Sequence, residues 1–277
     1  MPNLKKDCCI LKENGKDYQE IQNDYIRLSV DAQGRIRIAT IEGGVIMSDL
    51  VYYASHDSSG YELGLRGISV ACVDDSTIVI RGSGTSGEDV KLSLKVSAEE
   101  PRLDVQVSIN YTKETTIWRE ALIGCFDVPV TEVYRKNGKA DLDNLQQEYW
   151  LDDQGVRFGS GRRSALIYHN PSLSSLQLKP EERMLIFNLD YFRDHPHIYF
   201  PYQEDGAGRW VNLSQSAYNK DSKRENSFSI HFGIQPLANP RLMLVPHGYL
   251  AGYIFTEHAD ETNLRTHRAV YFGSEDI

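Results

Sequence analysis

The sequence has few positively charged residues and no segment where they gather. Lysine and arginine together number 30, against 39 aspartates and glutamates, so the formal net charge of the 277 residues is −9. A protein that binds duplex nucleic acid usually presents a basic face to the phosphates. An anionic membrane surface attracts basic segments in the same way. We therefore predict that the protein binds no nucleic acid and is not drawn to such a membrane.

Long apolar runs are also missing. No stretch reaches the ~18 apolar residues that indicate a membrane-spanning helix. The first residues, MPNLKKDCCILKENGKD, are polar and lack the apolar core of a signal peptide. We expect a soluble chain without a signal peptide or transmembrane segment. The compartment stays open, because the protein is either cytoplasmic or preceded by a leader outside this sequence.

Cysteine is scarce and is not spaced for a metal. The four cysteines include no C-x-x-C pair, which leaves a zinc ribbon unsupported. Cys8 and Cys9 are adjacent, and adjacent cysteines rarely bond each other because the geometry is strained. We expect the four side chains to be buried free thiols.

Alternating strand patterns dominate the rest of the chain. Residues 25–41 alternate apolar and polar side chains on both sides of Gly34, which is typical of a hairpin. Residues 91–96 and 103–109 alternate almost strictly, which predicts one buried and one solvated face. Further candidates are STIVIRGSG, SALIYH, SLQL, RMLIFNLDY, HIYFPY, SFSIHFGIQ and RLMLVP. Turn signals separate these strands at roughly ten-residue spacing, which predicts a mostly β protein, a large antiparallel β-sandwich of the supersandwich type.

The pattern changes near the carboxyl end. Residues 249–256 form an apolar strand without clean alternation, as in parallel sheets. A polar loop follows, and then a helix that Asp260 or Thr262 can cap and Gly273 can close. We predict a β-sandwich domain over residues 1–245 and a short strand–helix unit over residues 246–277. This unit either packs on the sandwich, drives self-association, or begins an α/β domain that is incomplete here.

The loop of this carboxyl-terminal unit carries three residues of chemical interest. Glu257, His258 and Asp260 follow the carboxyl end of the predicted strand, where α/β folds place their chemistry. A carboxylate and an imidazole in this spacing can bind a divalent metal or act as acid and base. The alternative is a capping aspartate beside a solvated histidine.

Two segments resemble a known enzyme family. GYIFTEHAD through THRAVYFGSEDI resembles the opening strand and loop of catalytic domains of polysaccharide deacetylases. QEYWLDDQGVRFGSGRRSALIYHNPSLSSLQL through NLDYFRDHPH resembles the β-sandwich ahead of such domains in some bacterial proteins. The resemblance implies that His258 and Asp260 stand where a metal ligand and a catalytic base would fall. The chain has no His-x-x-x-His, the second motif of that family. The resemblance thus implies an accessory domain that is not catalytic alone, within a carbohydrate esterase.

A second cluster of ionisable residues is Asp194-His195-Pro196-His197. Residues two apart on a strand point the same way, so His195 and His197 could share a metal. Pro196 cannot donate a ladder hydrogen bond, which favours an edge strand or a turn. The alternative is a chance pair. No cofactor other than this divalent metal is indicated.

Aromatic residues are plentiful, with 16 Tyr, 9 Phe and 3 Trp. Carbohydrate sites place aromatic faces against sugar rings and read the hydroxyls with polar groups. Our candidates for such a site are Tyr149, Trp150, Arg162, Arg163, His169 and Trp210. The alternative is that these aromatic side chains fill an ordinary core.

Three functional hypotheses follow from these observations. The first, which we favour at this point, is a non-catalytic sandwich module that binds or positions a polysaccharide. The second is a free-standing sugar epimerase or lyase on a supersandwich. Its acids and bases would lie on a concave sheet face, with His169, His195, His231 and Glu148 as the candidate set. The third is a structural or assembly module without a small ligand.

Overall fold

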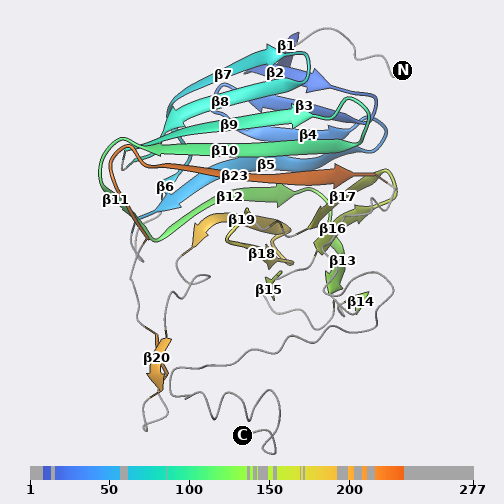
Figure 1. Ribbon diagram of the computed structural model, residues 1–277. Helices are drawn as coiled ribbons and strands as arrows, with labels where there is room; N and C mark the ends of the chain where they lie inside the picture. The colour runs from blue at the N-terminus through green and yellow to red at the C-terminus, as the bar shows by residue number, and fades with distance from the viewer. Residues whose placement is uncertain are drawn as a thin grey trace, which may run out of the picture. The chain divides into compact units, whose positions relative to one another are not determined.

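The computed structural model describes most of the first 233 residues (Figure 1). The described residues are 9–13, 16–56, 62–85, 87–135, 138–139, 142, 149–151, 155–168, 170, 172–191, 199–202, 208–210 and 216–233. The fold divides into a unit of residues 1–237 and a unit of residues 238–277. The second unit lies outside the described residues, so the account below concerns the first.

One large sheet, sheet A, has the strand order β1-β2-β3-β4-β5-β12-β19-β18-β15, and β6 also pairs with β5. Every neighbouring pair is antiparallel. The strands are β1 (Cys9–Glu13), β2 (Lys16–Gln22), β3 (Ile26–Asp31), β4 (Ile36–Thr40), β5 (Gly44–Ser55), β6 (Glu62–Leu63), β12 (Arg119–Phe126), β15 (Tyr149–Trp150), β18 (Ser175–Lys179) and β19 (Met184–Tyr191).

The second large sheet, sheet B, has the order β14-β13-β16-β17-β23-β10-β9-β8-β7 and is also antiparallel. Its strands are β7 (Arg66–Asp74), β8 (Thr77–Ser83), β9 (Glu88–Val96), β10 (Arg102–Tyr111), β13 (Val130–Arg135), β14 (Gly138–Lys139), β16 (Gly155–Ser160), β17 (Arg163–Tyr168) and β23 (Lys223–Phe232). Two small sheets pair β11 (Thr115–Ile117) with β22 (Ser216–Tyr218) and β20 (Tyr199–Tyr202) with β21 (Gly208–Trp210).

The alternating segments of the sequence form the strands expected of them. Residues 25–41 contain β3 and β4, and Gly34 between them has a φ of 73°, a left-handed conformation that glycine adopts without steric cost. Along β9 and β10, apolar side chains are buried and the intervening polar ones are more exposed. The two sheets pack face to face in a sandwich (Figure 1). The predicted mostly β sandwich is thereby confirmed.

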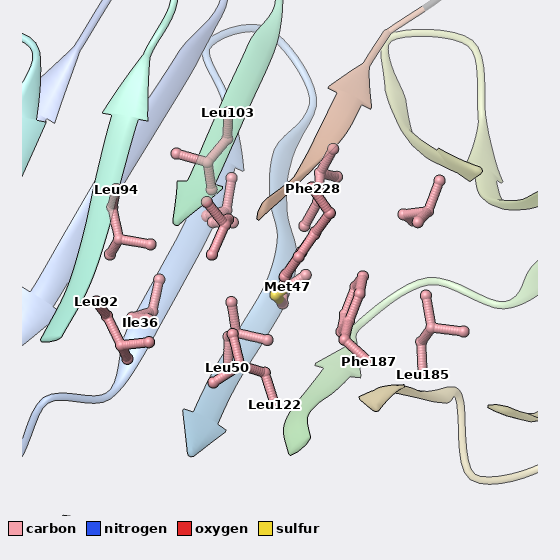
Figure 2. Close-up of a cluster of buried hydrophobic side chains, with 14 of the residues drawn as sticks. Ile36, Met47, Leu50, Leu92, Leu94, Leu103, Leu122, Leu185, Phe187 and Phe228 are labelled. Atoms are coloured by element: carbon pink, nitrogen blue, oxygen red, sulfur yellow. The ribbon is translucent and has the colours of Figure 1, made fainter. Parts of the chain in front are cut away.

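The core lies between the two sheets and draws on both of them (Figure 2). Phe187 of β19 stacks on Phe228 of β23, with 4.3 Å between ring centroids. Phe126 of β12 stacks on Phe158 of β16, with 3.7 Å between centroids. Burying a large apolar side chain contributes about 1.5–3 kcal/mol, so these stacked rings hold the two layers together.

The other features that the sequence predicts have mixed outcomes. Cys125 is free, as expected, but only partly buried, and the expectation is wrong for Cys72, which is disulfide-bonded. No α-helix occurs among the described residues. That part of the chain therefore contains no helix that is long and apolar enough to cross a membrane. The strand–helix unit of residues 246–277 lies outside the described part of the chain. The boundary at residue 245 therefore stays a prediction.

Candidate functional site

A hollow of about 390 Å³ opens on the outer face of sheet A, the face turned away from sheet B. It lies over β2, β3, β4 and the start of β5. Side chains of Ile21, Leu28 and Ile38 on the same strands point the other way, into the core. The hollow is lined by Tyr18, Glu20, Arg27, Ser29, Arg37, Ala39, Thr40, Ile41, Gly44 and Val45. Strand alternation thus supplies a polar floor on one side and the core on the other.

Glu20 is the central polar group of the hollow. The register places Glu20 opposite Ser29, and Ser29 opposite Arg37, in one row across three strands. Ser29 donates a hydrogen bond from Oγ to Glu20 Oε2 at 3.1 Å. Arg27 Nε lies 3.4 Å from Glu20 Oε1, and the Arg27 side chain is about half exposed. The carboxylate is therefore held in place by two neighbours while the hollow stays open to solvent.

A second polar region, the ion cluster, is buried between the sheets at one end of the sandwich. Arg224 of β23 forms ion pairs with Glu120 of β12 and with Asp190 of β19, the latter at 3.1 Å. Three tyrosines complete the ion cluster. Tyr52 and Tyr111 donate to Glu120, and Tyr218 donates to Asp190 Oδ2 at 2.5 Å.

Burial controls the protonation of the ion cluster. Removal from water raises the pKa of Tyr52, Tyr111 and Tyr218 above its ordinary value of 10.0, because burial disfavours the charged form of a group, here the phenolate. Burial lowers the pKa of Arg224 for the same reason. The tyrosines are therefore hydrogen-bond donors, and the two carboxylates find their partners within the chain. This saturation is what a buried charge requires.

A third group of polar side chains joins β12, β18 and β19 on the outer face of sheet A. Arg119 donates to Asn188 Oδ1 at 2.8 Å and to Gln177 Oε1 at 2.5 Å. Asn188 Nδ2 donates to Ser175 Oγ at 2.8 Å. The Arg119 guanidinium also lies 4.2 Å from the centroid of the Tyr191 ring. These side chains hold neighbouring strands in register, and Asn188, Gln177 and Ser175 are buried.

The carbohydrate candidates predicted from the sequence are dispersed over the structure. Tyr149 and Trp150 form β15, paired with Leu178 and Gln177. Trp210 on β21 pairs with Tyr199, in a different sheet.

The two arginines of the candidate set are adjacent, Arg162 in the turn between β16 and β17 and Arg163 at the start of β17. Arg162 is exposed and pairs with Glu42, and Arg163 donates to the carbonyl oxygen of Val45 at 3.0 Å. Val45 also lines the hollow, so among the described candidates only Arg163 contacts a residue of that site.

The remaining candidates cannot be placed in a site. His169, His195, His197, Glu148, Glu257, His258 and Asp260 lie outside the described residues. Among the described residues, no group of three or more His, Cys, Asp or Glu side chains could hold a metal ion.

His231 of the epimerase set lies on sheet B, where β23 pairs it with Arg102 and Leu166. Burial, together with the charge of Arg102, lowers its pKa from 6.5. His231 therefore belongs to sheet B and is separate from the hollow of sheet A.

The residues of the hollow and of the ion cluster were not predicted as a site from the sequence. Arg27, Ser29 and Arg37 are the polar members of the alternating segment 25–41, and outward polar residues of that kind are ordinary in strands. Only the register with β2, which brings Glu20 beside them, distinguishes them. Glu120 and Asp190 had a weak signal, since each is a carboxylate within an otherwise apolar strand.

Comparisons with solved structures identify proteins of similar fold. A candidate aldose 1-epimerase from Escherichia coli K12 aligns with 80% of this chain and 100% of its own, with a TM-score of 0.50 and 11% identity. The described sandwich shares its fold with that protein. A TPR-domain containing protein from Parabacteroides distasonis aligns over 84% of this chain and 50% of its own (TM-score 0.48, 9% identity). A galactose mutarotase-like protein from Lactobacillus casei aligns over 77% and 99% (TM-score 0.45, 8% identity).

These comparisons correct the family resemblance drawn from the sequence. The resemblance to polysaccharide deacetylases is wrong, because the sandwich matches the whole length of an epimerase-like protein. No family model matches the sequence, and no curated protein matches it. At 11% identity the likeness concerns the fold alone.

Proposed function

We propose that the protein is a sugar-active protein that binds a carbohydrate in the hollow on the outer face of sheet A. The observation that carries this proposal is the carboxylate of Glu20, fixed by Ser29 and Arg27 at the floor of an open hollow. The fold supports it, because the E. coli protein of similar fold is described as a candidate aldose 1-epimerase.

The lining suits the chemistry of a sugar. Sugar hydroxyls donate to carboxylates and accept from guanidinium groups, and Glu20, Arg27 and Arg37 supply both kinds of partner. Tyr18 adds an aromatic ring, which can lie against the apolar face of a sugar. A volume near 390 Å³ is within the size range of small-ligand sites. The hollow therefore combines the polar and apolar groups that a sugar requires.

The ion cluster is less suited to a ligand than the hollow. Glu120 and Asp190 are buried, and each accepts hydrogen bonds from at least two side chains of the chain itself. A sugar could reach these carboxylates only by displacing those donors. Glu20 also has two partners, Ser29 and Arg27, but its side chain keeps some exposure and that of Arg27 is half exposed, so a ligand can reach both.

Interconversion of the two anomers of an aldose is a second candidate function. It is favoured by the presence of Glu20 and Tyr18 in one hollow of an epimerase-like fold. Glu20 would accept the proton of the anomeric hydroxyl while the bond from C1 to the ring oxygen breaks. Tyr18 would donate a proton to that ring oxygen. Rotation about C1–C2 and the reverse steps then close the other anomer, with no net gain or loss of atoms.

The test compares the protein with Glu20→Gln, which keeps the shape of the side chain but removes its charge. Titration with glucose, galactose and N-acetylglucosamine should show saturable binding of at least one sugar. The variant should bind that sugar about tenfold more weakly, because a hydrogen bond to a charged group is lost. The matched control Glu99→Gln alters an exposed residue of the turn between β9 and β10 and should bind like the parent.

A second measurement tests the catalytic candidate. Exchange between α and β anomers, followed by NMR, should be faster with the protein than in buffer, and slower with Glu20→Gln. Binding without faster exchange would support the sugar site and refute the epimerase. Absence of binding to every sugar, or equal binding by the variant, would overturn the proposal.

A further inference from the structure

Two exposed apolar residues are neighbours on sheet A, and one of them lines the hollow. Tyr25 is 42% exposed and Ile41 is 43% exposed, which places both among the most exposed large hydrophobic residues described. The amide of Ile41 donates to the carbonyl oxygen of Tyr25 at 2.8 Å, so the two residues are cross-strand neighbours. Ile41 also lines the hollow. We call these two residues the apolar rim.

The apolar rim continues the outer face of sheet A. Ile26 pairs with Thr40, and both are buried. The neighbouring pair, Tyr25 and Ile41, alternates with them and therefore lies on the outer side of the sheet, as does the pair Arg27 and Ala39. A ligand lying over Arg27 therefore meets Tyr25 and Ile41 if it extends toward the turn that precedes β3.

The backbone that carries Tyr25 is firmly held. Asn23 Oδ1 accepts hydrogen bonds from the amides of Tyr25 and Ile26 at 2.8 and 2.7 Å. Asn23 Nδ2 donates to the carbonyl oxygens of Ser97 and Glu100, at 2.7 and 3.0 Å. The turn is thus tied both to its own strand and to the turn between β9 and β10 of sheet B. Exposure of the Tyr25 ring is a feature of an ordered turn.

Single exposed apolar residues are common on protein surfaces and need no explanation. Two of them side by side, one on a rigid turn and both next to a polar hollow, are a different case. An aromatic ring held in place loses little conformational entropy when a ligand covers it. Such a ring beside hydrogen-bonding groups suits a second sugar unit better than a charged or purely apolar ligand.

We propose that the hollow and the apolar rim together bind an oligosaccharide of at least two sugar units. This inference rests on the proposed sugar site. One unit occupies the hollow over Glu20, and the next unit places the apolar face of its ring on Tyr25 and Ile41. The specificity of the site for chain length then resides in the apolar rim, and its recognition of hydroxyls resides in the hollow.

The experiment compares monosaccharides with their disaccharides in the whole protein and in Tyr25→Ala. The probes are glucose with cellobiose, galactose with lactose, and N-acetylglucosamine with chitobiose, titrated by calorimetry. The parent should bind one disaccharide more tightly than its monosaccharide. Tyr25→Ala should weaken binding of that disaccharide about fivefold to tenfold and leave the monosaccharide unchanged. The control Val73→Ala removes an apolar side chain that is 65% exposed on β7 of sheet B, and should change neither affinity.

The outcomes separate this inference from the proposal on which it rests. If the monosaccharide binds and the disaccharide gains nothing, or if Tyr25→Ala weakens both equally, the apolar rim is not a second subsite while the sugar site stands. If no probe binds to the parent, the sugar site itself fails and the inference fails with it. Since Tyr25 is exposed, the melting temperature of Tyr25→Ala should match that of the parent. A match excludes unfolding as the cause of weaker binding.

Discussion

The hollow of sheet A and the ion cluster both set a carboxylate among arginine and hydroxyl groups, but they differ in what remains to be bound. Glu120 is fully buried and accepts from Tyr52, Tyr111 and Arg224. Glu20 has Ser29 and Arg27 as partners and faces an open hollow. The same chemical groups therefore stabilise the fold in one place and are available to a ligand in the other.

The comparison shows that burial decides which role a charged group can take. A charge removed from water must find its partners inside the protein, since an unpaired buried charge is costly. A charge at an open hollow keeps water as an exchangeable partner, which a ligand can replace. Substitutions in the two regions should accordingly change different quantities, stability in the first and binding in the second.

The largest effect is expected from breaking the ion cluster. Arg224→Met removes the cation that both Glu120 and Asp190 contact, and should lower the free energy of unfolding by about 3–5 kcal/mol. Chemical denaturation measures this change. Arg27→Met in the hollow removes a half-exposed charge and should change stability by less than about 1 kcal/mol.

A second variant keeps the prediction testable if the Arg224→Met protein does not fold. Adding Glu120→Gln removes one of the two stranded charges, so the double variant should be more stable than Arg224→Met alone. If both single arginine substitutions cost the same, the distinction between the two regions is wrong.

A smaller effect should follow from the tyrosines of the ion cluster at alkaline pH. Their folded-state pKa values are raised, so they stay protonated where the unfolded chain has begun to ionise. Their contribution to stability is thus complete below pH 10.0 and is lost as the pH rises above that value. Tyr218→Phe should cost about 1 kcal/mol at neutral pH and make stability fall less steeply above pH 10.0. Melting curves from pH 7 to pH 11 give both quantities, and an unchanged slope would contradict the assignment.

The smallest effect concerns Asp49 on β5, which lies between the two cases. It is partly buried, its Oδ1 has no hydrogen-bond partner, and burial raises its pKa from 3.8 despite the opposing charge of Arg35. A carboxyl with a raised folded-state pKa favours folding below its unfolded value, and this contribution is lost as the pH rises. Asp49→Asn should therefore stabilise the protein by about 0.5 kcal/mol at pH 7 and by less at pH 3.5. A loss of stability at pH 7 would show that the charge has a partner.

The alternating strands could be predicted, and so could β18 and β19, from the short apolar runs SLQL and RMLIFNLDY. Strands β3, β4, β9 and β10 each turn one face to the core and one to water, so their periodicity is visible in the sequence. The central strands β5 and β12 were not identified, because side chains on both of their faces are largely buried and no alternation marks them.

The candidate site could be predicted much less well. Glu20 and Arg37 are 17 residues apart in sequence and meet only because β2, β3 and β4 pair in one register. Sequence patterns indicate which residues face outward but not which outward residues become neighbours. The residues predicted to form a carbohydrate site were instead large aromatic ones such as Trp150 and Trp210, whose strands belong to different sheets.

Strand β23 has a consequence for how the protein is made. It lies between β10 and β17 in the interior of sheet B, yet it is the last of the described strands to leave the ribosome. The hydrogen bond from Ser229 to Asp104 joins residues 125 positions apart. Until residue 232 emerges, β10 presents an unpaired edge, and such edges invite pairing with other chains. A nascent chain of this protein should depend on chaperones late in synthesis, at the moment when one strand closes the sheet.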